Sequence, residues 1–256
     1  MPHGGRLRVA IAGAGMVTHY HIKAWSSIPG VEVVAIYNRH LDKAINRAKE
    51  FCIPKTYSDI ILMLEKERPD ALDIAVALEV HLEFAKMAAE RGIHILCQKP
   101  MAPSFQDAER LVFDVQGKVR FMVHENWRFR PQYRKAASWI AEGKTGRINE
   151  FRFSTRSSGL LTRTESGRPV ALERQPFMAH MPHFIILELL IHHLDTIRFL
   201  LGEMSVIGAQ TSHISSEVIG EDLAVILLKA EKGAIGTVSG NFSAAGAPRL
   251  PQDRLE

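Results

Sequence analysis

The chain has 256 residues, of which 46% are hydrophobic and 23% are charged, and this composition excludes a disordered or fibrous protein. Its net charge of +4 comes from charges spread along the sequence rather than gathered in a run, so nucleic acid is not an expected partner. No stretch approaches the roughly 18 uninterrupted apolar residues of a membrane span, and two cysteines are too few for a disulfide framework. We therefore expect a soluble, cytoplasmic, reduced protein without a membrane or nucleic-acid partner.

The first half of the chain alternates between segments typical of strands and segments typical of helices. Strands are expected at residues 7–11, 31–37, 72–77, 93–97 and 119–123, and helices at 18–28, 42–51, 59–67, 81–91 and 104–115. This alternation predicts a doubly wound parallel sheet that is covered on both faces. The apolar run after Arg6 and Arg8 also resembles a signal peptide, but the glycines close behind it favour a strand entering a tight turn.

The second half of the chain has a different pattern. Helices are expected at residues 131–141 and 183–201, strands at 149–155, 206–211, 223–228 and 234–238, and an irregular stretch at 157–181. Glu231, Lys232 and Gly233 join the last two strands as a hairpin would. We predict an α+β domain with a largely antiparallel sheet, and a domain boundary that separates residues 1–123 from residues 124–256.

A glycine-rich turn follows the first strand and opens the first helix. Gly13 allows the tight turn, Gly15 lets a pyrophosphate approach the backbone, and the start of the helix supplies N–H donors and a favourable dipole. Thr18 stands where the dinucleotide-binding fingerprint has its third glycine, a position that serves helix packing more than phosphate binding. The alternative is an ordinary connection between a strand and a helix.

The end of the second strand bears on the choice of cofactor. An acidic residue there would bind the 2′-hydroxyl of NAD and repel the 2′-phosphate of NADP. This sequence has Asn38 and then Arg39, whose guanidinium can pair with a phosphate. We expect NADP or NAD, with NADP slightly favoured, although Arg39 could instead stack on adenine or face solvent.

Several segments together resemble the Gfo/Idh/MocA oxidoreductases. Besides the glycine turn, the segments that carry the resemblance are residues 29–36, 68–75 with His81, Gln98-Lys99-Pro100, 125–128, 188–195, 221–224 and 233–237. They cover nearly the whole chain in family order, and Gln98-Lys99-Pro100, where the family has Glu-Lys-Pro, is the most specific mark of the first half.

The resemblance implies a Rossmann dinucleotide-binding domain at 1–123 and a substrate-binding domain at 124–256, whose sheet makes homodimers or homotetramers. It implies hydride transfer between NAD(P) and a hydroxyl or ketone of a sugar, cyclitol or related polyol. Residues expected at the cofactor are Gly13, Gly15, Met16, Val17, Asn38, Arg39, Ala77, His81, Gln98 and Lys99. Residues expected at the substrate are Asn126, Trp127, Glu188 and His192.

Oxidation of a hydroxyl requires a base, a cation beside the developing alkoxide and a hydride acceptor. We expect His192 to be the base and Lys99 to be the cation, at the carboxyl end of the fifth strand. Glu188 lies four residues before His192, so on an α-helix it would orient the imidazole or bind a second substrate hydroxyl. The alternative is a merely amphipathic helix. No metal is expected, although Glu188 and His192 could gather one with His180 or His183.

Some residues depart from the family pattern. Gln98 replaces a glutamate, Glu188 an aspartate and Leu190 a glycine, and the chain ends where the family continues into further strands, so the second sheet is expected to be cut short. Two other functions therefore stay open: a glycosidase that retains its cofactor, and a non-catalytic NAD(P)-binding sensor.

Overall fold

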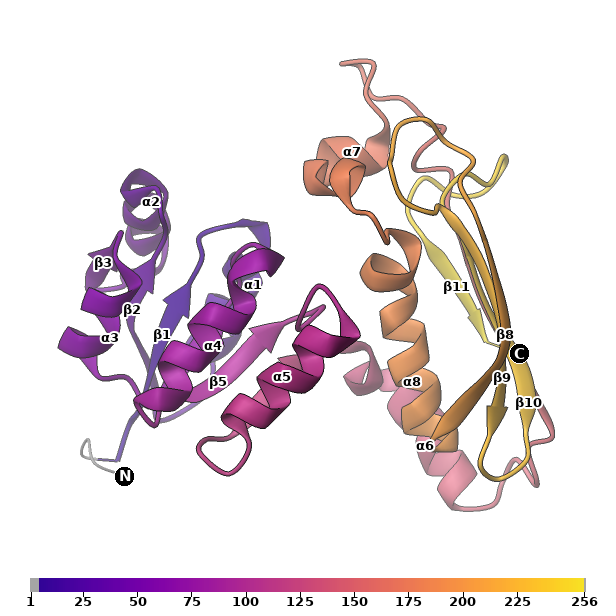
Figure 1. Cartoon of the computed structure of the whole chain (residues 1–256), viewed down its shortest axis with the longest axis horizontal. Helices are drawn as coiled ribbons and strands as arrows, with labels where there is room; N and C mark the ends of the chain where they lie inside the picture. The colour runs from indigo at the N-terminus through magenta and orange to yellow at the C-terminus, as the bar shows by residue number, and fades with distance from the viewer. Residues whose placement is uncertain (1–4, 256) are drawn as a thin grey trace. The chain divides into compact units, whose positions relative to one another are not determined.

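The computed structural model describes residues 5–255, with side chains as far as Pro251. The chain forms two compact units, Met1–His124 and Glu125–Glu256 (Figure 1). Each unit has its own sheet and its own hydrophobic core.

The first unit is built on a six-stranded sheet in which every neighbouring pair is parallel, in the order β3-β2-β1-β4-β5-β6. The strands are β1 (Leu7–Ala12), β2 (Val31–Tyr37), β3 (Lys55–Tyr57), β4 (Ala71–Ile74), β5 (His94–Gln98) and β6 (Phe121–His124). This is the strand order of dinucleotide-binding sheets, in which ligands bind beyond the carboxyl ends of the strands.

Helices cover both faces of this sheet. They are α1 (Met16–Ser26), α2 (Leu41–Phe51), α3 (Ile60–Glu67), α4 (His81–Glu90) and α5 (Phe105–Val115). Alternate residues of β1 point to opposite faces: Val9 and Ile11 belong to the cluster of α1 and α2, and Ala10 and Ala12 to that of α3, α4 and α5. Burial on both faces explains why the strands are continuously apolar in the sequence.

The second unit contains a five-stranded mixed sheet in the order β11-β7-β10-β9-β8. Its strands are β7 (Glu150–Arg156), β8 (Met204–Ser212), β9 (Leu223–Ala230), β10 (Ile235–Asn241) and β11 (Gln252–Leu255). Only the pairing of β7 with β10 is parallel, because these strands are joined by a long crossover, whereas β9 and β10 form the expected hairpin.

Helices cover only one face of the second sheet. The helices are α6 (Pro131–Ala141), α7 (Val170–Arg174) and α8 (Ile191–Leu201), and within residues 125–255 no helix lies on the opposite face (Figure 1). Strand β9 accordingly alternates between buried and exposed residues, with Ala224 and Ile226 in the core and Val225 and Leu227 exposed.

The predicted fold class is confirmed: a doubly wound parallel sheet precedes an α+β unit with a largely antiparallel sheet. The structure differs from the predicted elements in several places, among them β3 (Lys55–Tyr57), a strand that the sequence pattern did not predict. The stretch 157–181 contains α7 and a 3₁₀ turn at Pro176–His180, and residues 252–255 form a strand that was not expected. The helix expected over 183–201 is a π-helical turn at Ile186–Leu190 followed by α8. Among the described residues, no helix is both long and apolar enough to span a membrane.

Candidate functional site

The residues predicted to bind a cofactor follow the carboxyl ends of four neighbouring parallel strands. These strands are β2, β1, β4 and β5, which end at Tyr37, Ala12, Ile74 and Gln98. The carboxyl ends of parallel neighbours lie along one edge of a sheet, so the predicted cofactor residues gather at one edge of the first unit.

The glycine turn has the geometry that a dinucleotide requires. Gly13 has φ +120°, its N–H donates to the Tyr37 carbonyl at 2.8 Å, and a Cβ placed on it would lie 2.1 Å from the Ala75 carbonyl oxygen. Gly15 is the N-cap of α1, and apart from its chain neighbours no described residue has an atom within 4 Å of where its Cβ would be. The start of α1 therefore presents open backbone, with Met16 exposed beside it, and this fits a pyrophosphate.

Thr18, which departs from the fingerprint, is fully buried in α1. Its hydroxyl donates to the Gly15 carbonyl at 2.7 Å, and Nη2 of Arg47 in α2 donates to the same oxygen at 3.0 Å. The Thr18 hydroxyl thus stabilises the glycine turn through a hydrogen bond from within α1. Arg47 adds a positive charge on the Gly15 carbonyl, a contact that the sequence analysis did not identify.

The end of β2 carries an amide and a cation where NAD-specific proteins have a carboxylate. Asn38 Oδ1 accepts the His40 N–H at 3.0 Å, and the Nε–H of exposed Arg39 donates to His40 Nε2 at 3.2 Å. Burial raises the pKa of the Tyr37 phenol, an effect that the Arg39 charge opposes. Arg39 therefore brings a positive charge to this end of the edge, where a 2′-phosphate would lie.

Lys99 lies immediately after β5 and is half-buried. Its backbone N–H donates to Gln98 Oε1 at 2.7 Å, and its peptide bond to Pro100 is cis. His81 is buried between the carbonyls of Pro100 and Val76, each 3.2 Å from a ring nitrogen, and burial lowers the pKa of its imidazole. His81 thus joins the Lys99 segment to the turn after β4, where Ala77 is exposed.

In the second unit, His192 is paired with a carboxylate that the sequence analysis did not assign to the site. His192 Nδ1 lies 2.6 Å from Glu125 Oε2, and both side chains are nearly buried. The backbone N–H of Trp127 donates to Glu125 Oε1 at 3.0 Å, and this contact holds the carboxylate in place. In a neutral imidazole that donates from Nδ1 to Glu125, Nε2 carries the lone pair, and this is the form that a general base needs.

Trp127, predicted to contact substrate, packs on the catalytic candidate itself. Its ring stacks on His192 with centroids 4.7 Å apart and planes inclined by 4°, and the Arg130 guanidinium lies 3.7 Å from the Trp127 ring centroid. Trp127 is 9% exposed, whereas the neighbouring Asn126 is exposed. The stack restricts tilting of the His192 ring out of its present plane.

The other polar residues near His192 are held by partners of their own. Asp195 accepts two hydrogen bonds from Arg128, which raises the pKa of that guanidinium, and His193 Nδ1 lies 3.1 Å from the Leu189 carbonyl. Glu188 lies in the π-helical turn, so the spacing of an ordinary α-helix does not relate it to His192. The carboxylate at His192 Nδ1 is that of Glu125.

Sequence reasoning missed Glu125 because 67 residues separate it from His192. A signal was nevertheless present, because Glu125 begins one of the segments that carry the family resemblance. Among the described residues, no group of three or more histidine, cysteine, aspartate and glutamate side chains is placed to hold a metal ion.

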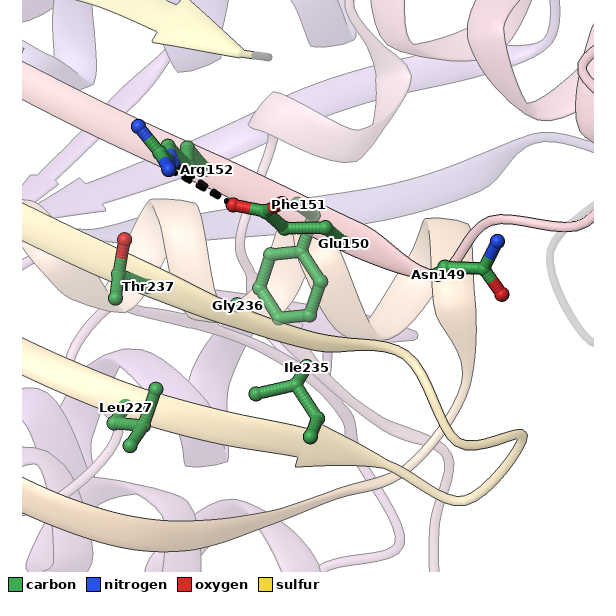
Figure 2. Close-up of a pocket in the computed structure, with 8 residues that line it drawn as sticks. All are labelled: Asn149, Glu150, Phe151, Arg152, Leu227, Ile235, Gly236 and Thr237. Carbon is green, nitrogen blue, oxygen red and sulfur yellow. Dashed lines mark hydrogen bonds and ion pairs between the residues drawn. The ribbon is translucent and has the colours of Figure 1, made fainter.

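A separate hollow of about 480 Å³ lies on the second sheet (Figure 2). Leu227, Ile235 and Thr237 line it beside an ion pair between Arg152 and Glu150, whose N–O distance is 3.0 Å. No predicted catalytic, cofactor or substrate residue lines this hollow.

Comparison with protein-family models gives two matches that together account for most of the chain. Residues 7–124 match a model described as an oxidoreductase family with an NAD-binding Rossmann fold. Residues 133–256 match the GFO/IDH/MocA C-terminal domain.

Two similar curated proteins are D-apiose dehydrogenases. The one from Paraburkholderia graminis is 33% identical over 98% of this chain and 65% of its own length, and the one from Rhizobium rhizogenes is 31% identical over 98% and 70%. The chain thus spans about two thirds of the length of these relatives.

Solved structures give the same picture of the fold. An oxidoreductase from Agrobacterium radiobacter, in complex with NAD⁺, L-tartaric acid and magnesium, has a TM-score of 0.89 and 29% identity over 98% of this chain and 71% of that one. Levoglucosan dehydrogenase in complex with NADH and levoglucosan has a TM-score of 0.83, with the same two coverages, at 23% identity, and supports the fold alone.

Proposed function

The chain belongs to the GFO/IDH/MocA oxidoreductase family and has its NAD-binding Rossmann fold, and from this premise we propose that it transfers a hydride between NAD(P) and a sugar or polyol. The reaction would oxidise a secondary hydroxyl to a ketone, or reduce the matching ketone. The observation that carries the proposal is the His192–Glu125 pair, which presents a histidine as a base within a unit of the matching family.

We assign the proton transfer to His192 and the stabilisation of the developing alkoxide to Lys99. In the oxidative direction, His192 Nε2 takes the hydroxyl proton while Glu125 stabilises the imidazolium that forms. The Lys99 ammonium stabilises negative charge on the substrate oxygen. Glu188, Asn126 and Trp127 are assigned to the walls of the substrate site. When bound, NAD(P)⁺ supplies the acceptor for the hydride.

The first unit is assigned to the cofactor. The open backbone at Gly15 suits the pyrophosphate, and the amide–cation pair Asn38 and Arg39 suits NADP as well as NAD, with NADP slightly favoured. We expect R39A to weaken NADPH binding about tenfold and to change NADH binding less than twofold, because only NADPH carries the 2′-phosphate. The matched control is R91A, on an exposed arginine at the end of α4.

The substrate class follows from the family and its relatives. Because two D-apiose dehydrogenases match 98% of the chain, branched and linear pentoses are the first substrates to test, followed by inositols and anhydrosugars. The free cysteines Cys52 and Cys97 support a cytoplasmic location, where thiols stay reduced.

The uncovered face of the second sheet supports a homodimer or homotetramer. Val225, Leu227 and Ile235 are each more than a third exposed on this face of the sheet. Apolar side chains gathered on one face favour association. L227E should shift the oligomer towards monomer in light scattering, whereas I61E, on an exposed apolar residue of the first unit, should not.

The deciding experiment begins with a titration of the purified chain with NADPH and with NADH, in which nicotinamide fluorescence measures binding. Turnover is then measured on a panel of pentoses, hexoses, inositols and anhydrosugars. We expect turnover that needs added cofactor and is abolished by K99A and H192A in folded protein. Turnover of glycosides without added cofactor would instead identify a glycosidase that retains it. Cofactor binding without any turnover would identify a sensor.

A further inference from the structure

A chain of hydrogen bonds, buried at Asp73 and His21, runs through the first unit and ends on the backbone of half-buried Lys99. Asp73 of β4 is fully buried, and both of its carboxylate oxygens lie 3.0 Å from Nδ1 of His21, which is 4% exposed. His21 Nε2 lies 3.4 Å from Gln98 Nε2, and Gln98 Oε1 accepts the Lys99 N–H at 2.7 Å.

The direction of these hydrogen bonds is determined by the two ends. At one end, the Asp73 carboxylate can only accept, so His21 Nδ1 donates to it. At the other end, the Lys99 N–H can only donate, so the Gln98 oxygen faces it and the Gln98 amide nitrogen faces His21. His21 Nε2 must then accept from Gln98. The chain of bonds is self-consistent only when His21 is neutral and carries its proton on Nδ1.

The groups that surround His21 are compatible with this state. Trp25, from the same helix, donates to Asp73 Oδ2 at 2.7 Å and stabilises the carboxylate. Burial raises the pKa of the Cys97 thiol on β5 to about 12, so this neighbour of Asp73 adds no charge at neutral pH. From β6, the His124 ring packs edge-on against His21, with centroids 4.0 Å apart.

We propose that His21 is a positioning residue for Lys99: held by Asp73, it orients the Gln98 amide, which in turn fixes the backbone from which the Lys99 side chain leaves β5. The inference rests on the catalytic role proposed for Lys99, but the arrangement of protons can be tested without turnover. It also explains how glutamine serves beside Lys99, because its amide donates to His21 and accepts from Lys99 at the same time, which an ionised carboxylate cannot do.

Two substitutions should act on this chain in opposite ways. In D73N, the oxygen of the introduced amide accepts from Trp25, and the NH₂ group of that amide faces His21 Nδ1. His21 then moves its proton to Nε2, Gln98 turns over and the Lys99 N–H loses its acceptor. In Q98E, a carboxylate accepts from both His21 and Lys99, so His21 becomes protonated on both nitrogens while the Lys99 N–H stays bonded.

The experiment is nitrogen NMR of the His21 ring at pH 7, together with hydrogen exchange of the Lys99 amide, in the full chain. We expect the Nδ1–H tautomer in the unsubstituted protein, the Nε2–H tautomer with Lys99 exchange about tenfold faster in D73N, and the doubly protonated ring with unchanged Lys99 exchange in Q98E. D73N should also lower kcat about tenfold while the sugar KM changes less than threefold.

The controls match each change. W25F removes a donor to Asp73 without reversing the chain of bonds, and Q116E adds the charge of Q98E at an exposed site on the first unit. Both should keep the Nδ1–H tautomer. An Nε2–H tautomer in the unsubstituted protein, or unchanged Lys99 exchange in D73N, would overturn the inference. If D73N does not fold, a neutral His21 ring in Q98E would overturn it equally. Full activity of K99A would overturn the proposed function instead and leave the tautomer results standing.

Discussion

The two units hold their chemical groups in different ways. In the first unit, the candidate residues follow the ends of parallel strands, and backbone contacts such as that of Gly13 N–H with the Tyr37 carbonyl fix the edge. In the second unit, one histidine on α8 is held by side chains from the segment that opens the unit, through the Glu125 bond and the Trp127 stack. The first arrangement follows from topology, whereas the second depends on a few particular side chains.

This difference predicts where substitutions act. In the first unit, a change in the glycine turn should disturb folding or cofactor binding, because the backbone itself forms that part of the site. In the second, a change at the site should disturb chemistry while the core, which lies around Phe153, Phe184 and Leu190, stays intact.

The largest expected effect is on the base. H192A should lower kcat about a thousandfold, because the group that takes the proton is removed, and should leave NADPH affinity within about twofold. Steady-state kinetics and fluorescence titration measure the two quantities. H183A, on an exposed histidine shortly before the π-helical turn, is the control. A kcat within tenfold of the unsubstituted enzyme would mean that His192 is not the base.

The second effect concerns the two glycines of the turn. G13A should reduce the free energy of unfolding by about 3 kcal/mol, because its Cβ would meet the Ala75 carbonyl and its φ suits glycine. G15A should cost less than about 1 kcal/mol, because its Cβ enters open space, but should weaken dinucleotide binding about tenfold. Denaturant unfolding and titration separate the two. Equal loss of stability in both variants would contradict this account of the turn.

A smaller kinetic effect is expected at Glu125. E125Q should lower kcat about thirtyfold. An amide allows the His192 tautomer with its proton on Nε2, which cannot act as the base, and it no longer stabilises the imidazolium. Substrate KM should change little. E150Q, on an exposed glutamate of β7, is the control. If E125Q and E125A kept full kcat over the whole pH range, the carboxylate would have no part in the reaction.

The smallest expected effect is a dependence of stability on acid in the first unit. Burial lowers the pKa of His81 in the folded state. Below about pH 6.5 the unfolded chain therefore binds more protons than the folded one, and the protein loses stability as the pH is lowered. Thermal unfolding from pH 7.5 to 5.5 should show this slope, and H81Q should flatten it. A slope that H81Q leaves unchanged would assign it to other groups.

The sequence predicted the first unit more fully than the second for a physical reason. Its signals are local in the sequence: apolar runs that form strands, helix caps such as Asp59 and Ser104, and the glycine turn. Local patterns of this kind, together with the strand order, are enough to predict where these residues lie in the unit. The Glu125–His192 and Arg128–Asp195 pairs each join residues 67 positions apart, and no local pattern reports them. Asp73 illustrates the same limit within the first unit: in the sequence it is a polar residue in an apolar strand, and only its contact with His21 gives it a role.

The π-helical turn at Ile186–Leu190 shifts the phase of α8 by one residue relative to the chain before it. Successive residues of an α-helix are rotated by about 100°, and a π turn takes up one residue more than an α turn. Deleting a single residue such as Leu187 would let the segment become α-helical and would turn either Phe184 or His192 away from its present neighbours. The extra residue lets one segment satisfy both the packing of Phe184 and the direction of His192. Gaining or losing the π turn requires the insertion or deletion of one residue. In related chains, the number of residues between the position of Phe184 and the histidine therefore indicates whether the turn is present.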